Sequence, residues 1–147
     1  MNGTVRALFL KLDKGAKSVP KDSVQAGPEG FDGDYHTGNS KRRQILLISG
    51  SVIDQLDLEP GNAYENVVVD GLDVMTLREG QRLRLGDALV AVTIPCEPCR
   101  QMERLRTGLQ EALRNRRGMF VTVLEPGIVR IGDSVCEESV VENSLER

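Results

Sequence analysis

The chain has 147 residues, of which 19 are basic and 22 acidic, so its formal net charge at pH 7 is −3. This length fits one domain, and 39% hydrophobic with 28% charged residues is ordinary for a soluble globular protein. Aromatic residues make up only 3% and Trp is absent, which argues against stacking platforms for single-stranded nucleic acid. No apolar run approaches the roughly 20 residues that cross a bilayer, and the first residues do not resemble a secretory signal. We therefore expect a cytoplasmic protein without membrane or nucleic-acid partners.

Short strands dominate the predicted elements. Seven segments are rich in β-branched or aliphatic residues and are bounded by Gly, Pro or Asp. They are residues 3–10, 44–48, 66–70, 82–85, 88–93, 119–124 and 129–135. Gly86-Asp87 indicates a tight hairpin, Glu125-Pro126-Gly127 a second turn, and a further short strand is expected near residues 23–26. Strands at this spacing favour a β-barrel or sandwich.

Two helices are predicted between the strands, at residues 49–56 and at about residues 100–117. In the longer one, apolar residues recur at helical spacing and predict a face that packs on the core. They are Met102, Leu105, Leu109, Ala112 and Leu113. The same segment holds six arginines and two glutamates, which indicates either a solvated helix face or a patch that attracts anions. Residues 1–137 are expected to form the domain, followed by a flexible acidic tail at 138–147.

The most specific chemical motif is a pair of cysteines between a predicted strand and the longer helix. Residues 93–100 read Thr-Ile-Pro-Cys-Glu-Pro-Cys-Arg. Backbone N–H groups at a helix start and the adjacent Arg100 favour a thiolate, which suits a nucleophile, a persulfide carrier or a metal ligand. The alternative is an inert buried pair. A thioredoxin-like exchange motif would need βαβ units around it, and a zinc site would need more ligands, for which His36 and Cys136 are candidates without zinc-finger spacing.

A second motif is rich in glycine. Residues 27–38 read Gly-Pro-Glu-Gly-Phe-Asp-Gly-Asp-Tyr-His-Thr-Gly, which allows the backbone to approach a ligand closely but does not match a P-loop. His36 is the only histidine of the chain. It is either a hydrogen-bonded structural residue or a group for proton transfer or ligation.

The order of these motifs resembles the MOSC domain, the C-terminal domain of molybdenum-cofactor sulfurases, which also occurs as small stand-alone proteins. The resemblance covers about residues 4–135. It rests on Gly-Asp-Tyr-His-Thr-Gly at 33–38, Arg-Gln at 43–44, Glu-Asn at 65–66, Leu-Gly-Asp at 85–87 and Pro-Cys-Glu-Pro-Cys at 95–99.

The resemblance implies a mostly-β fold, a MOSC-type barrel with a few short helices. It also implies a functional cysteine, which falls on Cys99 and carries a persulfide sulfur or ligates the molybdenum of a pterin cofactor. The residues that match the other family elements are Gly33, Asp34, His36, Gly38, Arg43, Glu65 and Asn66. We expect His36 to orient a sulfur group or the cofactor, and Arg43 and Arg100 to hold a phosphate or carboxylate. Cys96 is expected to resolve a persulfide or to pack.

Three functions follow as hypotheses. The first is a sulfur carrier or molybdenum-cofactor-binding protein, acting as a sulfur transferase or as part of a molybdenum-dependent reductase. The sequence shows no pyridoxal-phosphate site of its own, so a pyridoxal-phosphate-dependent cysteine desulfurase is the expected donor and a molybdoenzyme the expected acceptor. The second is a non-catalytic module that delivers the cofactor. The third is a barrel stabilised by zinc.

Overall fold

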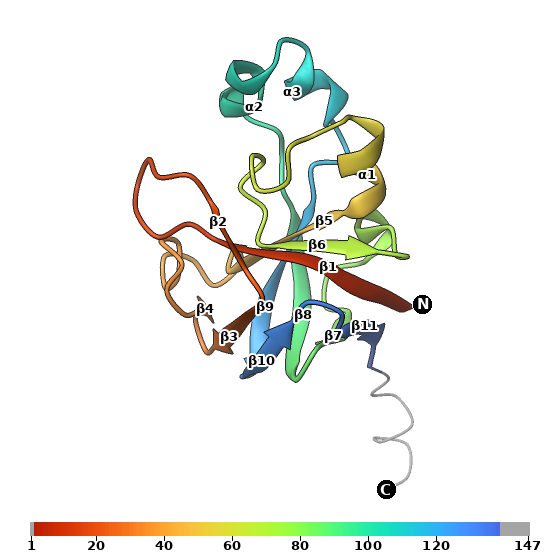
Figure 1. Ribbon diagram of the computed structural model, residues 1–147. Coiled ribbons are helices and arrows are strands. Elements are labelled where there is room, and N and C mark those ends of the chain that lie inside the picture. The colour runs from red at the N-terminus through yellow and green to blue at the C-terminus, as the bar shows by residue number, and fades with distance from the viewer. Residues whose placement is uncertain (1, 139–147) are drawn as a thin grey trace, which may run out of the picture.

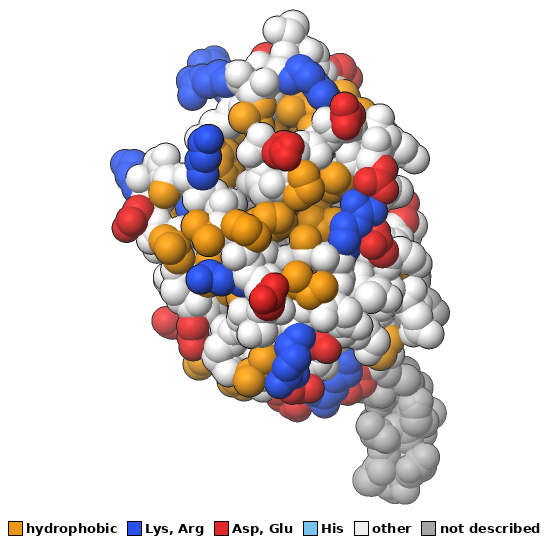
Figure 2. Space-filling view, in the orientation of Figure 1, with side chains coloured by type: hydrophobic (Ala, Val, Ile, Leu, Met, Phe, Trp, Pro, Cys, Tyr) orange, Lys and Arg blue, Asp and Glu red, His pale blue; other side chains and the backbone are white. Residues whose placement is uncertain are grey.

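The computed structural model describes residues 2–138 (Figure 1). Glu138, the first residue of the predicted tail, pairs with Arg82 and Arg84, and the rest of that tail lies outside the described residues. No helix within residues 2–138 is both long enough and apolar enough to span a membrane. Figure 2 shows apolar side chains across the middle of one face, with basic and acidic side chains around them.

Seven strands within residues 2–138 close into a barrel. They are β1 (Asn2–Leu10), β5 (Ile45–Ser49), β6 (Val67–Asp70), β7 (Arg82–Leu85), β8 (Ala88–Pro95), β9 (Met119–Glu125) and β11 (Ser134–Glu137). Around the barrel the order is β1-β6-β5-β9-β8-β7-β11, and the pairing of Gly3 with Val135 joins β11 back to β1. The predicted fold class, a mostly-strand barrel with short helices, is therefore confirmed.

Further strands extend the barrel at two places. β2 (Val19–Lys21) pairs with the end of β1, and a small sheet consists of β10 (Gly127–Arg130), β3 (Ser23–Gly27) and β4 (Gly30–Phe31). β3 confirms the short strand expected near residues 23–26.

The single strand predicted at residues 129–135 was wrong, because the chain turns between β10 and β11. Gly132 has a φ of 93°, and its N–H donates to the carbonyl of Val5. β10 then pairs with β3, whereas β11 pairs with β1 and β7. The turn moves the chain from one sheet to the other.

Two apolar layers hold the fold together. Leu47 and Val69 belong to the cluster inside the barrel, whereas Ile48 and Val68 belong to a second cluster outside it. Because β5 and β6 are covered on both faces, they are continuous apolar runs rather than alternating ones. These two strands are parallel and are connected through α1 (Gly50–Gln55), the helix predicted at residues 49–56.

The single helix predicted at residues 100–117 was also wrong. The structure has two short helices, α2 (Arg100–Leu105) and α3 (Leu109–Ala112). Gly108 between them adopts a left-handed conformation with a φ of 87°, and the Glu103 carboxylate accepts from the N–H of Gly108 at 2.7 Å. The break leaves Leu105 45% exposed, while Met102 and Leu109 still reach the outer apolar cluster. In Figure 1, α2 and α3 lie together at one end of the molecule.

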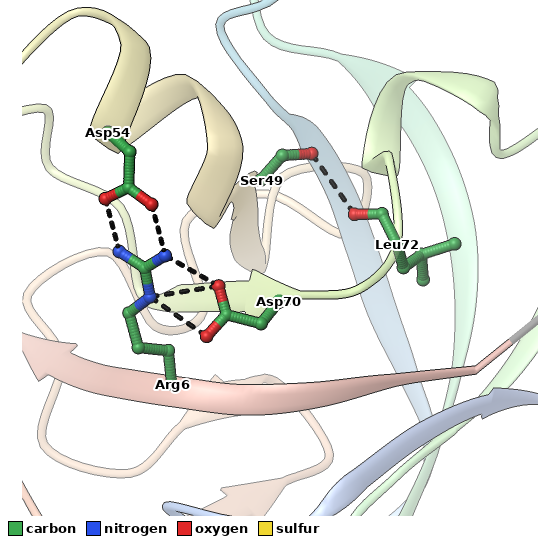
Figure 3. Close-up of polar contacts among 5 residues, drawn as sticks. All are labelled: Arg6, Ser49, Asp54, Asp70 and Leu72. Carbon is green, nitrogen blue, oxygen red and sulfur yellow. Dashed lines mark hydrogen bonds and ion pairs between the residues drawn. The ribbon is translucent and has the colours of Figure 1, made fainter.

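A polar cluster attaches α1 to the barrel (Figure 3). Arg6 of β1 donates through Nη2 to Asp54 of α1 at 2.8 Å and through Nε to Asp70 of β6 at 3.0 Å. These bonds raise the pKa of Arg6, with Asp54 the largest cause, and lower the pKa of Asp54. The Ser49 hydroxyl, just before α1, accepts from the N–H of Val74 at 2.9 Å.

Candidate functional site

The buried carboxylate of Asp34 is one of the attachments of the glycine-rich loop, residues 27–38, to the barrel, beside the Tyr35 N–H, which donates to the carbonyl of Lys11 at 2.6 Å, and Gln44 Nε2, which donates to the carbonyl of Pro28 at 3.3 Å. Asp34 Oδ1 accepts from the N–H of Lys11 at 2.9 Å and from Asn66 Nδ2 at 3.3 Å. Asp34 Oδ2 accepts from the N–H of His36 at 3.1 Å and lies 3.6 Å from His36 Nδ1. The carboxylate thus places His36 next to the end of β1 and the start of β6, with the imidazole about half exposed.

Asn66 joins three strands at the same point. Its Oδ1 accepts from the N–H of Leu46 at 3.0 Å, and its Nδ2 donates to the carbonyl of Phe9 at 3.2 Å as well as to Asp34. Every polar atom of this side chain is therefore used inside the protein. Asn66 fixes the relative positions of the residues around it.

A cavity of about 320 Å³ opens beside these residues. It is lined by Lys11, His36, Arg43, Gln44, Leu46, Tyr64, Asn66, Cys96, Gln101, Arg117 and Phe120. The lining residues come from the ends of β1 and β8, the starts of β5, β6 and β9, the glycine-rich loop and α2. We refer to this cavity as the barrel-end pocket.

The barrel-end pocket combines positive charge with apolar walls. Lys11, Arg43 and Arg117 line it, and none of the lining side chains in the described part of the chain is acidic. Lys11 Nζ lies 4.4 Å from the centroid of the Tyr64 ring, a cation–π contact, and Tyr64 has a φ of 60°, which is uncommon for a residue with a side chain. With Phe120 on the wall as well, the pocket suits an organic anion.

The two cysteines of the Cys-Glu-Pro-Cys motif have different surroundings. Cys96 is half-buried and lines the pocket, and its N–H donates to the carbonyl of Gly118 at 2.9 Å. Cys99 is exposed just before α2, with its Sγ 3.9 Å from Oε1 of Gln101, which itself lines the pocket. Burial raises the pKa of the Cys96 thiol, and the positive charges of Arg117 and Arg43 oppose this rise only in part.

An acidic and a basic side chain, Glu65 and Arg117, are buried at the pocket, and Arg117 is also one of its lining residues. Glu65 Oε2 accepts from the N–H of Gly61 at 2.7 Å, and Arg117 Nη2 donates to the carbonyl of Ala63. Glu65 Oε1 and the Nε and Nη1 atoms of Arg117 have no hydrogen-bond partner within residues 2–138. Burial raises the pKa of Glu65, while its bond from Gly61 and the charge of Arg117 act in the opposite direction.

The raised pKa of Glu65 predicts how stability depends on pH. The folded state binds the Glu65 proton more tightly than the unfolded state, so its stabilising contribution is complete below the usual pKa of glutamate, about 4.3. That contribution is lost as the pH rises through the raised pKa of the folded protein. The wild type should therefore lose free energy of unfolding, relative to Glu65→Gln, as the pH rises through this window.

Urea unfolding of both proteins in steps from pH 4 to pH 8 measures this difference. The matched control is Glu59→Gln, because Glu59 is exposed on the same connection before β6. A difference between wild type and Glu65→Gln that stays constant with pH would contradict the expectation.

The predicted site residues fall into two groups. His36, Arg43 and Asn66 line the barrel-end pocket, and Asp34 and Glu65 lie directly behind it. Cys99 and Arg100 are exposed beside it at the start of α2 and are not among its lining residues. Gly33 and Gly38 have φ values of 90° and 85°, so they form the turns of the loop, and Gly38 lines a separate hollow of about 330 Å³.

Sequence patterns did not point to Lys11, Tyr64, Arg117 or Phe120 as site residues. Arg117 had been included in the basic helical segment, where exposed arginines are expected, and Arg104, Arg106 and Arg114 are indeed exposed. One available signal was its position directly before Gly118 and β9, where a long side chain can turn inward.

The zinc hypothesis gains no support from the arrangement of ligands. Within residues 2–138, no group of three or more His, Cys, Asp or Glu side chains is placed to hold a metal ion. A structural zinc site takes four such ligands.

Comparisons with known proteins agree with the barrel. The YuaD protein from Bacillus subtilis superimposes with a TM-score of 0.82 at 22% identity, covering 95% of this chain and 97% of that chain. YiiM from Geobacillus stearothermophilus gives a TM-score of 0.76 at 17% identity, covering 93% and 75% of the two chains. YiiM from Escherichia coli gives 0.65 at 19% identity, covering 93% and 70%. At these identities the similarity shows a shared fold.

A search of curated proteins finds no match. A sequence profile of the MOSC domain matches residues 32–136, which is well over half of the chain and includes the second half of the glycine-rich loop, the cysteine motif, the strands β5 to β10 and most of β11. The chain therefore belongs to the MOSC-domain family, which is linked to molybdenum-cofactor sulfurase-like proteins.

Proposed function

We propose that this MOSC protein binds the molybdenum cofactor or carries its sulfur, with the barrel-end pocket as the binding site and Cys99 as the persulfide carrier or metal ligand. The observation that supports this most strongly is the pairing of a cationic pocket with thiols: Cys96 lines it and Cys99 lies beside it, next to Gln101. Thiolate is a ligand type that suits a soft metal centre.

The residues present fit the group that the family implies. The positive charges of Lys11, Arg43 and Arg117 match an anionic ligand. Nε and Nη1 of Arg117, which have no partner within residues 2–138, could donate hydrogen bonds to its oxygens. The rings of Tyr64 and Phe120 match a flat organic body. When bound, the cofactor would supply a redox-active metal and a phosphate-bearing pterin. The chain's own residues would bind the anion, position it and exclude water from part of it.

Sulfur transfer would use the exposed thiol. The Cys99 thiolate attacks the outer sulfur of a donor protein's persulfide, the donor cysteine leaves as a thiolate, and Cys99 keeps the transferred sulfur. Its exposure makes Cys99 accessible to a donor such as a pyridoxal-phosphate-dependent cysteine desulfurase. Cys96 lines the pocket, where burial raises the pKa of its thiol, and would face the ligand instead. A reducing cytoplasm suits this chemistry, since all three cysteines are free thiols.

The test measures bound molybdenum and cyanide-releasable sulfur after expression with and without molybdopterin synthesis. We expect the wild type to carry one of the two signals and Cys99→Ser to lose at least about 90% of it, because a serine hydroxyl neither holds sulfane sulfur nor replaces a thiolate ligand. Cys136→Ser is the matched control, since Cys136 lies in β11 away from the pocket-lining residues and should keep the signal. Neither signal in the wild type, or an equal signal in Cys99→Ser, would overturn the proposal.

A further inference from the structure

The two cysteines of the Cys-Glu-Pro-Cys motif lie at different depths of the barrel-end pocket. Cys96 is half-buried and belongs to the pocket wall, whereas Cys99 is exposed and is not among the lining residues. The Cys99 thiol donates to Gln101 Oε1 at 3.9 Å, and Gln101 does line the pocket. One thiol is therefore accessible to a protein outside, and the other contacts whatever the pocket holds. A sulfur atom on Cys99 still has to move inward before it meets a bound ligand.

The chain between the two thiols is short and loosely held. Cys96 Sγ lies 3.8 Å from the carbonyl oxygen of Glu97, so this thiol is turned along the segment that leads to Cys99. The N–H groups of Glu97 and Cys99 have no acceptor within residues 2–138. Burial is the main cause that raises the pKa of Cys96, and a negative charge on Cys99 raises it further, so each thiol lies within range of the other's charge. A persulfide would extend the reach of Cys99 by about 2 Å.

The positive charges of the pocket favour a persulfide on Cys96 over one on Cys99. A persulfide is a stronger acid than a thiol, so it is anionic near neutral pH. Arg117 and Arg43 line the same cavity as Cys96, and their charges lower the pKa of its thiol against the effect of burial. The same charges would stabilise an anionic persulfide at that position. Arg100, beside Cys99, is exposed, so water and salt screen its charge.

We propose that Cys96 is a second sulfur carrier, which takes the outer sulfur of a Cys99 persulfide and presents it inside the barrel-end pocket. The Cys96 thiolate attacks that outer sulfur, the bond between the outer sulfur and Cys99 Sγ breaks, and Cys99 leaves as a thiolate. The proton of the Cys96 thiol ends on Cys99, and no electrons are gained or lost overall. The inference deepens the proposed function, because it rests on Cys99 as the first carrier and adds the step that brings the sulfur to the ligand.

Timed alkylation of the purified Cys136→Ser protein tests this transfer. The probe is inorganic polysulfide, added below one equivalent and removed by desalting before iodoacetamide traps thiols and persulfides at successive times. Trypsin releases residues 85–100 as one peptide with both cysteines, and tandem mass spectrometry separates them by cleavage before Pro98. We expect sulfur first on Cys99 and then on Cys96, at constant total and at a rate independent of protein concentration. At the end Cys96 should hold about threefold more sulfur than Cys99.

Variants distinguish transfer from direct loading of Cys96. Cys99→Ser should load Cys96 about tenfold more slowly than its parent, because a half-buried thiol with a raised pKa reacts slowly by itself. Cys96→Ser should keep its sulfur on Cys99. Arg43→Gln should lower the final ratio of Cys96 to Cys99 persulfide about threefold, since one charge that favours the inner anion is lost. Arg104→Gln, an exposed arginine of α2 outside the pocket, is the matched control and should leave the ratio unchanged.

The outcomes separate this inference from the proposed function. Sulfur that stays on Cys99, or a Cys96–Cys99 disulfide formed with release of sulfide, would exclude the transfer and leave Cys99 as the only carrier of the motif. Equally fast loading of Cys96 in Cys99→Ser would also exclude it, because Cys96 would then need no first carrier. Failure of Cys99 to accept sulfur at all would contradict the sulfur-carrying function together with the transfer.

Discussion

Replacing Gly118 with alanine is expected to lower the free energy of unfolding by about 3–5 kcal/mol, which is exceptional for the addition of one methyl group. Gly118 lies directly before β9 with a φ of 142°, a conformation that residues with a side chain rarely adopt. An added Cβ would lie 2.5 Å from the carbonyl oxygen of Leu47 and 3.0 Å from Leu46 Cδ1. Because β9 pairs with β5 at this point, neither strand can move aside without losing its register.

Urea unfolding followed by circular dichroism measures the loss, with Gly132→Ala as the matched control. Gly132 also has a positive φ, 93°, but nothing lies within 4 Å of an added Cβ. Its substitution should therefore show the conformational part alone, about 1–2 kcal/mol. Equal losses in the two variants would contradict a steric role for the contact with Leu47.

The same substitution should reach the pocket. The Gly118 carbonyl accepts from the N–H of Cys96 at 2.9 Å. Arg117, directly before Gly118, and Phe120, two residues after it, both line the cavity. A displaced Gly118 would therefore shift the pocket wall formed by Cys96 and the wall formed by Arg117 and Phe120. Any folded fraction of Gly118→Ala is expected to carry less bound molybdenum or cyanide-releasable sulfur than Gly132→Ala does.

Replacing Asp34 with alanine is expected to lower the free energy of unfolding by about 3 kcal/mol. The carboxylate is 8% exposed and accepts from three donors, the N–H groups of Lys11 and His36 and the amide of Asn66. Without it these buried or half-buried donors lose their acceptor, and each costs about 1 kcal/mol or more. The expected consequence is that the glycine-rich loop separates from the end of β1.

Urea unfolding gives the size of the effect, and amide hydrogen exchange shows where it occurs. Exchange should accelerate at Lys11 and His36 in Asp34→Ala. Asp32→Ala is the matched control, since Asp32 lies in the same loop with an exposed side chain and should change stability by less than about 0.5 kcal/mol. If Asp34→Ala stayed within that limit, the carboxylate would not be an attachment of the loop.

These expectations also define what Asp34 does at the pocket. Its oxygens accept from donors inside the protein, so it positions His36 and Asn66. The resemblance had placed it among the cofactor-binding residues, and direct contact with a cofactor stays a prediction. A carboxylate that already accepts from three donors inside the protein has little capacity left to accept a hydrogen bond from a ligand.

Short sequence patterns predicted the strands well where a continuous apolar run is itself the buried strand. The apolar runs at residues 45–48 and 67–69 became β5 and β6, with side chains buried both inside the barrel and against the outer layer. The same patterns failed at residues 100–117 and 129–135. In the first segment the Glu103 carboxylate accepts from the N–H of Gly108, and in the second β10 pairs with β3. Neither contact can be recognised from the spacing of apolar residues along the chain.

The chain's own patterns were sufficient for the family and the β-rich class, and they singled out the two motifs that lie at the barrel-end pocket, since spacing, turn residues and residue type are encoded in short segments. Three-dimensional packing was needed to separate Cys96, on the pocket wall, from Cys99, exposed beside it, and to bring Lys11, Arg43 and Arg117 together. These three cations are spread from the end of β1 to the start of β9. Only closure of the barrel makes them neighbours, and only burial leaves Nε and Nη1 of Arg117 without a partner within residues 2–138. Their meeting in one pocket therefore depends on long-range contacts that no short segment contains.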